Sequence, residues 1–127
     1  MGQKKVLVVD DEEMLVEFIK IRLEGNGYLV ETATDGTEGL LKVEQTNPDL
    51  IILDIYMQPM DGYTMLKELR KNEKTKDIPV IMLTASGKKR EVFEAEGISD
   101  YITKPFDSQD FLTRIGRVLE QGKKSDK

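Results

Sequence analysis

Five short apolar segments alternate with five amphipathic stretches along the chain, and this alternation limits the fold more than any other feature. The apolar segments have the length of buried strands, and the stretches between them repeat apolar residues with a helical period. The predicted strands cover residues 4–9, 28–33, 50–54, 78–83 and 99–103, and the predicted helices cover residues 11–24, 36–46, 62–72, 88–96 and 107–121. Strict alternation with short connections predicts an α/β fold, a doubly wound five-stranded parallel sheet with the flavodoxin-like strand order 2-1-3-4-5.

Local signals support these boundaries. Gly25-Asn26-Gly27 is a stop signal after the first predicted helix, and Asn47-Pro48 is one after the second. Asp35 and Asp107 are placed to cap the helices that follow them. No repeat or linker is visible, so residues 1–122 are expected to form one domain, followed by a polar tail at 123–127.

Composition excludes several classes of function. The formal net charge of −5 disfavours binding to nucleic acid or to an anionic membrane. The apolar runs are too short to span a bilayer and no signal peptide is visible, so a cytoplasmic location is expected. The absence of cysteine and histidine removes thiol nucleophiles, disulfides, Ser-His-Asp catalysis and imidazole metal sites. Any phosphohistidine that this protein meets must therefore belong to a partner.

Polar side chains stand at the ends of four of the predicted strands. Asp10-Asp11 follows the first strand, Asp54 ends the third, Thr84 follows the fourth and Lys104 the fifth. In the order 2-1-3-4-5 the ligand crevice opens at the carboxyl ends of strands 1 and 3, so the three aspartates should meet there. Clustered carboxylates raise each other's pKa unless a cation joins them, and an all-oxygen site suits Mg²⁺, with Mn²⁺ as a plausible substitute.

Each of these residues also has an ordinary structural explanation. Acids at the start of a helix cap free N–H groups and suit the positive end of the helix dipole. Asp54 could cap the loop after its strand, and Lys104 could be a solvated surface charge. Thr84 could reflect β-propensity, and Tyr101 could be a half-buried aromatic residue.

Taken together, the motifs resemble the receiver domain of two-component response regulators. The acidic pair after the first strand, LIILDIYMQPMDG around Asp54, VIMLTAS around Thr84 and YITKPF around Lys104 occur in the family's order and spacing over nearly the whole chain. The resemblance implies that Asp54 accepts a phosphoryl group from a histidine kinase or a histidine phosphotransfer protein.

The same resemblance implies roles for the neighbouring residues. Mg²⁺ would be bound directly by Asp11 and Asp54, through water by Asp10, and by the carbonyl of Tyr56. Lys104 would contact the phosphoryl group, with a cis bond to Pro105. Thr84 and Tyr101 would form a switch pair that changes the surface of helix 4, strand 5 and helix 5, where an unknown downstream protein binds.

Two features depart from the family pattern. Proline usually stands one position earlier in the loop after the acceptor, where this chain has Gln58 followed by Pro59. The stretch from Thr84 to Lys104 is also slightly short, with Glu96-Gly97-Ile98-Ser99-Asp100 in place of a common Gly-Ala-Asp-Asp pattern. Because this stretch belongs to the family's usual output face, we expect the departure to affect partner recognition more than the chemistry.

Three other functions would also place an acidic or phosphate-binding site at this edge of a sheet or use the same fold. A haloacid-dehalogenase-type phosphatase would need an acid two positions after the nucleophile, where this chain has Tyr56, so only slow self-dephosphorylation is expected. A cofactor-binding flavodoxin-like module would need a glycine or hydroxyl loop where Asp10-Asp11-Glu12 would repel phosphate. A receiver-like interaction module that is never phosphorylated stays open. The expected protein is a single-domain receiver without an output module, monomeric when unphosphorylated.

Overall fold

The computed structural model describes residues 2–57, 60–85 and 97–125, with the backbone alone for residues 122–125. Its strands are β1 (Lys5–Val9), β2 (Leu29–Ala33), β3 (Leu50–Asp54), β4 (Val80–Thr84) and β5 (Asp100–Thr103), and its helices are α1 (Glu13–Gly25), α2 (Gly36–Thr46), α3 (Gly62–Lys71) and α5 (Ser108–Ser125). All neighbouring strands are parallel, in the order β2-β1-β3-β4-β5. The predicted doubly wound, flavodoxin-like α/β fold is therefore confirmed.

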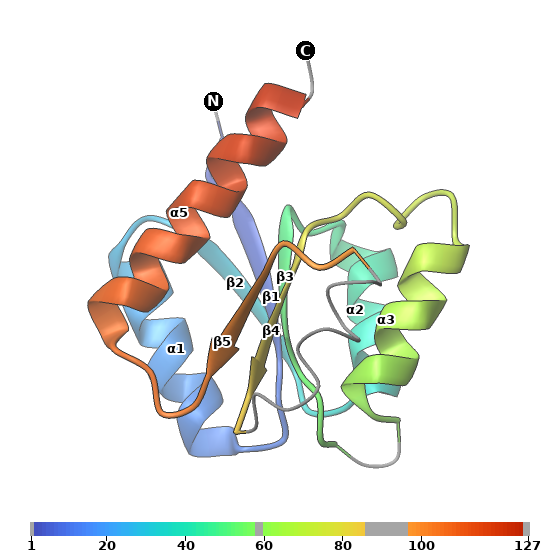
Figure 1. The fold of residues 1–127 in the computed structure, drawn as a ribbon, viewed down its shortest axis with the longest axis horizontal. Coiled ribbons are helices and arrows are strands. Elements are labelled where there is room, and N and C mark those ends of the chain that lie inside the picture. The colour runs from blue at the N-terminus through green and yellow to red at the C-terminus, as the bar shows by residue number, and fades with distance from the viewer. Residues whose placement is uncertain (1, 58–59, 86–96, 126–127) are drawn as a thin grey trace.

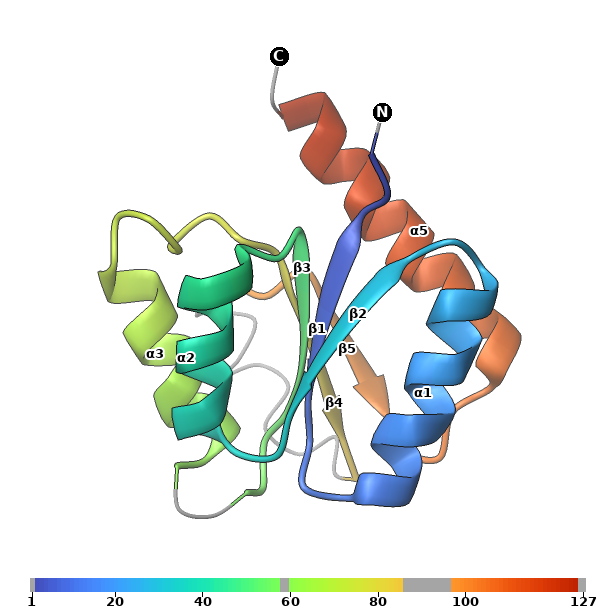
Figure 2. The same cartoon turned by 180° about the vertical axis from the view of Figure 1, so that it is seen from behind.

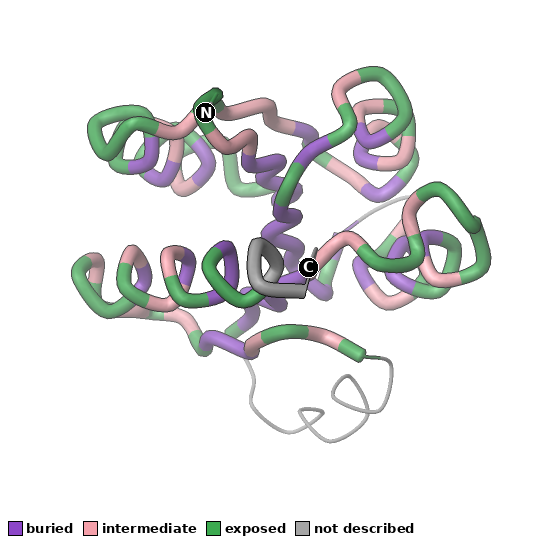
Figure 3. The backbone as a smooth tube through the Cα atoms, turned by 90° about the horizontal axis from the view of Figure 1, so that it is seen from above, coloured by how far each residue is buried: buried purple, intermediate pink, exposed green. Residues whose placement is uncertain are grey.

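Helices cover both faces of the sheet, with α1 and α5 on one face and α2 and α3 on the other (Figures 1 and 2). The central strands are buried on both sides, and their side chains alternate between two cores. In β3, Ile51 and Leu53 pack on the α2–α3 side, whereas Leu50 and Ile52 pack on the α1–α5 side. Buried residues accordingly follow the sheet and the inner helix faces, while exposed residues follow the outer turns (Figure 3). This two-sided burial explains the nearly continuous apolar runs in the sequence.

Several predicted boundaries moved by a few residues. The fourth strand was predicted to begin at residue 78 but begins at Val80, because the N–H of Ile78 donates to Thr75 O at 3.1 Å and Pro79 has no N–H. The first helix begins at Glu13 rather than at residue 11. The last helix continues to Ser125, beyond the predicted end at 121, so the backbone of residues 123–125 is helical rather than a tail. The predicted helix at 88–96 lies outside the described residues.

The capping predictions are confirmed. Asp35 caps α2 by accepting a hydrogen bond from the N–H of Glu38 at 2.9 Å. Asp107 accepts a hydrogen bond from the N–H of Asp110 at 2.8 Å, directly before α5. Asn47 ends α2 in the left-handed conformation with φ 50°, as the stop signal predicted. These local interactions fix where each helix starts or ends, and thereby which residues reach the carboxyl edge of the sheet.

Candidate functional site

Three carboxylates meet at the carboxyl edge of the sheet, as the strand order predicted. Asp10 follows β1, Asp54 ends β3, and Asp11 stands beside Asp10; one carboxylate oxygen from each lies within 4.8 Å of the others. Asp10 and Asp54 are buried, with 1% and 5% of their surface exposed, whereas Asp11 is exposed. The cluster thus consists of two buried carboxylates and one that is exposed to solvent.

The turn between β1 and α1 fixes the position of Asp10. Its N–H donates to the carbonyl of Ala33 on β2 at 3.1 Å, which continues the strand pairing by one residue. Its Oδ1 accepts a hydrogen bond from the N–H of Glu12 at 2.9 Å. These two contacts hold the Asp10 carboxylate next to β3. They also keep the backbone at Asp10 out of the helix, so α1 begins at Glu13 and not at residue 11 as predicted.

Lys104 reaches the same cluster from the end of β5. Its Nζ lies 2.9 Å from Asp10 Oδ2, 2.7 Å from Glu12 Oε1 and 3.7 Å from Asp54 Oδ1. The N–H of Lys104 donates to the carbonyl of Thr84 at 2.7 Å, and the bond between Lys104 and Pro105 is cis, as the resemblance implied. Three carboxylates therefore lie within 4 Å of one ammonium group, and Asp11 adds a fourth carboxylate to the cluster, so the site carries an excess of negative charge.

This excess appears in the pKa values. The pKa of Asp54 is raised from 3.8 to about 6, mainly by burial and then by the charges of Asp10 and Asp11, which together outweigh the lowering effects of Lys104 and of the Tyr56 N–H. Burial also raises the pKa of Asp10. For Lys104, burial lowers the pKa, but hydrogen bonds to Glu12 and Asp10 outweigh it, so the pKa is raised overall. The lysine stays charged, while ionised Asp54 is destabilised.

A divalent cation would relieve this repulsion. The donors that face one another are all carboxylate oxygens, which hard cations such as Mg²⁺ prefer, and the exposed Asp11 leaves the mouth open to water. Asp10, Asp11 and Asp54 therefore fit such an ion. Tyr56, the fourth predicted ligand, follows Asp54 in the next loop and is 52% exposed. The role of its carbonyl stays a prediction.

The two predicted switch residues are both buried. Thr84 ends β4 beside β3 with no exposed surface, and Tyr101 in β5 is 2% exposed. Tyr101 pairs in register with Met82 and packs into the core between the sheet and α3. The expectation of a half-buried aromatic residue was therefore wrong: this tyrosine is fully inside.

Gly62, at the start of α3, packs closely against the backbone of Asp54, the proposed acceptor. Its N–H donates to Ile55 O at 2.8 Å, and a Cβ added there would lie 2.0 Å from the carbonyl oxygen of Asp54. Only glycine lets α3 approach β3 this closely. Neither the need for glycine at position 62 nor the Glu12–Lys104 contact was predicted from the sequence. The Asp61-Gly62 pair after the acceptor loop was the available signal for the glycine.

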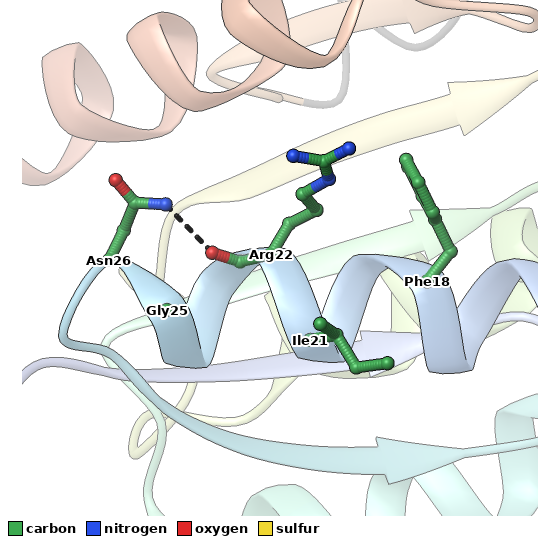
Figure 4. Close-up of a pocket in the computed structure, with 5 residues that line it drawn as sticks. All are labelled: Phe18, Ile21, Arg22, Gly25 and Asn26. Atoms are coloured by element: carbon green, nitrogen blue, oxygen red, sulfur yellow. Dashed lines mark hydrogen bonds between the residues drawn. The ribbon is translucent and has the colours of Figure 1, made fainter.

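A surface pocket also exists, but it lies along α1 and not at the acidic cluster. It is lined by Phe18, Ile21, Arg22, Gly25 and Asn26. Figure 4 shows Phe18 and Arg22 projecting from the same side of α1, where the guanidinium lies 5.1 Å from the ring centroid. The side chain of Asn26 donates to the carbonyl of Arg22 at 2.8 Å. The pocket therefore contains none of the predicted site residues.

Comparison with known proteins decides the family. A family model for the response regulator receiver domain matches residues 6–116. The chain belongs to this receiver family. The Bacillus subtilis alkaline phosphatase synthesis transcriptional regulatory protein PhoP is 42% identical over 120 residues, which cover 93% of this chain and 49% of that protein. The Synechocystis DNA-binding dual master transcriptional regulator RpaA is 40% identical, over 92% of this chain and 49% of that protein.

Solved receiver structures share the fold over their full length. A CheY-like response regulator receiver domain protein from Methanospirillum hungatei has a TM-score of 0.90 and 32% identity, covering 98% of this chain and 99% of that one. The Vibrio cholerae chemotaxis protein CheY4 has a TM-score of 0.86 and 35% identity, covering 92% and 99%. The receiver spans about half the length of the curated relatives that it matches.

Among the residues that the structure describes, no helix is both long and apolar enough to cross a membrane.

The structure brings Asp10, Asp11, Asp54 and Lys104 together as predicted. Their chemical roles, and those of Thr84 and Tyr101, remain predictions. The departures at Gln58-Pro59 and in most of the stretch before Gly97 lie outside the described residues.

Proposed function

We propose that this receiver is a signalling switch in which Asp54 accepts a phosphoryl group from a partner's phosphohistidine in the presence of Mg²⁺. The observation that carries this proposal is the buried Asp54 carboxylate, which faces two further carboxylates and lies 3.7 Å from the Lys104 ammonium. Membership of the receiver family supports it.

In the proposed step, a carboxylate oxygen of Asp54 attacks phosphorus. A P–O bond forms as the P–N bond to the donor imidazole breaks, and the electron pair of that bond stays on the imidazole nitrogen, which becomes the leaving group. Lys104 stabilises negative charge on the phosphoryl oxygens from the β5 side. Asp10, Asp11, Asp54 and the Tyr56 carbonyl would hold Mg²⁺, or Mn²⁺ in its place, and the ion would neutralise part of the negative charge at the site.

The phosphodonor must be another protein, because the chain contains no histidine. A histidine kinase or a histidine phosphotransfer protein fits this requirement. Next to the site, α1 exposes apolar side chains that suit contact with such a partner: Met14 is 89% exposed and Phe18 is 41% exposed. A cytoplasmic location, a monomeric resting state and a single-domain protein without an output module remain predictions.

The downstream half of the proposal concerns Thr84 and Tyr101. Negative oxygens on Asp54 would attract the Thr84 hydroxyl, and this would shift the packing of Tyr101 and the surface around β5 and α5. Tyr101 is buried in the present structure, so the shift concerns how often it occupies this inward position. We expect Thr84→Ala to accept the phosphoryl group but to show smaller NMR shifts in β5 upon phosphorylation. Shifts equal to those of the wild type would refute the coupling.

Intact mass spectrometry after incubation with acetyl phosphate or phosphoramidate tests the phosphoryl chemistry. We expect one phosphoryl adduct on the wild type that requires Mg²⁺ and is absent from Asp54→Asn. Asp77→Asn is the matched control, because Asp77 is exposed and its side chain has no hydrogen bond or ion pair to any described residue. If the wild type gains no adduct while a known receiver is labelled, the alternative of an unphosphorylated interaction module is favoured. Loss of an adduct over hours would fit slow self-dephosphorylation.

A further inference from the structure

Glu12 occupies the position before α1 but does not act as a helix cap. Its side chain makes no capping hydrogen bond. Its Oε1 instead accepts a hydrogen bond from Lys104 Nζ at 2.7 Å, which is shorter than the 2.9 Å contact to Asp10 and the 3.7 Å separation from Asp54. The ammonium group is therefore held closer to the α1 side of the site than to the proposed acceptor.

Asp10 strengthens this arrangement. One of its carboxylate oxygens accepts from the Glu12 N–H and the other from Lys104 Nζ, so backbone and side chain of Glu12 both take part in the same small network. The Lys104 side chain is 14% exposed, whereas that of Glu12 is 60% exposed. The lysine is enclosed, and Glu12 is the member of the network that can move away into solvent.

We propose that Glu12 is a positioning residue that holds the Lys104 ammonium away from Asp54 while the receiver is unphosphorylated. The inference rests on the proposed function of Asp54. In this proposal Lys104 moves toward a phosphoryl group at Asp54 and gives up its hydrogen bond to Glu12 for one to a phosphoryl oxygen. Glu12 makes no covalent bond in this exchange and transfers no proton. It competes for the lysine, and it thereby slows phosphoryl uptake.

Glu13 provides a matched control for charge. It is the next residue, it is exposed in the first turn of α1, and it has no side-chain hydrogen bond or ion pair to any described residue. Glu13→Gln removes the same negative charge near the same helix end without touching Lys104. Any effect of Glu12→Gln beyond that of Glu13→Gln therefore reports the contact with Lys104 and not the change in net charge.

The first test compares the rate of phosphorylation by phosphoramidate at saturating Mg²⁺, followed by intact mass. We expect Glu12→Gln to react about threefold faster than Glu13→Gln, which is the size of effect that a half-exposed ion pair supports. Equal rates, or a slower Glu12→Gln, would overturn the proposal, because the contact would then be irrelevant to Lys104 or would help it to act.

The second test needs no phosphorylation. Urea midpoints are measured in metal-free buffer for the wild type, Glu12→Gln, Lys104→Met and the double variant, and the same set is made with Glu13→Gln. We expect Glu12→Gln to lower the midpoint when Lys104 is present and to lower it less, or not at all, in the Lys104→Met background. Glu13→Gln should show no such dependence.

The two tests separate the possible failures. A wild type that takes up no phosphoryl group refutes the proposed function and with it the kinetic role of Glu12, whatever the urea data show. A receiver that is phosphorylated normally but shows no coupling between Glu12 and Lys104 overturns this inference alone.

Discussion

Replacing the proposed acceptor by its neutral isostere should make the protein more stable. In Asp54→Asn the carboxylate that is destabilised by burial and by Asp10 and Asp11 is lost, while an amide oxygen can still accept from the Tyr56 N–H. The unfavourable free energy comes from keeping Asp54 ionised at a buried position beside two other carboxylates. We therefore expect a gain in the free energy of unfolding near neutral pH.

The size of the gain follows from the pKa. A shift from 3.8 to about 6 corresponds to about 3 kcal/mol at pH 7.5, where Asp54 is ionised in both the folded and the unfolded states. This value is an upper estimate, because the amide does not pack or hydrogen-bond as the protonated acid does. With urea m-values of roughly 1–3 kcal/mol/M for small domains, this upper estimate corresponds to a rise of the unfolding midpoint by about 1–3 M.

The pH dependence has a definite sign. Between pH 3.8 and about 6 the folded protein retains a proton on Asp54 that the unfolded chain has released, so the stability of the wild type falls as pH rises through this window. Asp54→Asn lacks this dependence. The stability difference between the two proteins should therefore narrow by about 2 kcal/mol when the pH is lowered from 7.5 to 4.5.

The assay is urea unfolding followed by circular dichroism in buffer with EDTA, at several pH values. Asp77→Asn serves as the control and should stay within about 0.5 kcal/mol of the wild type throughout. The reasoning is refuted if Asp54→Asn is less stable than the wild type at pH 7.5, or if its advantage does not change with pH.

Two further predictions concern the same edge of the sheet. Gly62→Ala should destabilise the protein by roughly 3 kcal/mol in urea unfolding, because its Cβ would lie 2.0 Å from a backbone oxygen, whereas Gly116→Ala, with nothing within 4 Å, should be neutral or slightly stabilising. Mg²⁺ at ten times its dissociation constant should stabilise the wild type and Asp77→Asn by about 1.4 kcal/mol, and Asp54→Asn by much less. Equal stabilisation of all three proteins would argue against a site at Asp10, Asp11 and Asp54.

The strands of the sheet were predicted well because each strand corresponds to a run of apolar residues in the sequence. β3 was predicted at its observed limits, since Leu50–Asp54 is buried on both sides and its ends are marked by Pro48-Asp49 and by the charge of Asp54 itself. The start of β4 was missed for a related reason: Ile78 is apolar and partly buried, but it belongs to a turn. Hydrophobicity alone does not distinguish a strand residue from an apolar residue in the connection before it.

Only those residues of the candidate site that stand at the ends of strands were predictable from the sequence. Asp10, Asp54 and Lys104 come together because the backbone brings the carboxyl ends of β1, β3 and β5 to one edge. The Glu12–Lys104 contact depends instead on the side-chain conformation of one acid in an acidic run, where helix capping was the simpler explanation. The need for glycine at position 62 depends on how closely α3 approaches β3, which spacing along the chain does not encode.

The distribution of charge at this site suggests why its acids are not balanced by more cations. Lys104 is the one cation that touches the carboxylates among the described residues, and it contacts Glu12 and Asp10 more closely than Asp54. A second lysine beside Asp54 would lower its pKa and stabilise the resting protein, but it would also occupy the oxygens that a divalent cation and a phosphoryl group need. A poorly compensated Asp54 costs stability, and it keeps one carboxylate available. Stability and phosphoryl acceptance thus oppose each other at this residue, so the substitution that should abolish the chemistry is also the one expected to stabilise the fold.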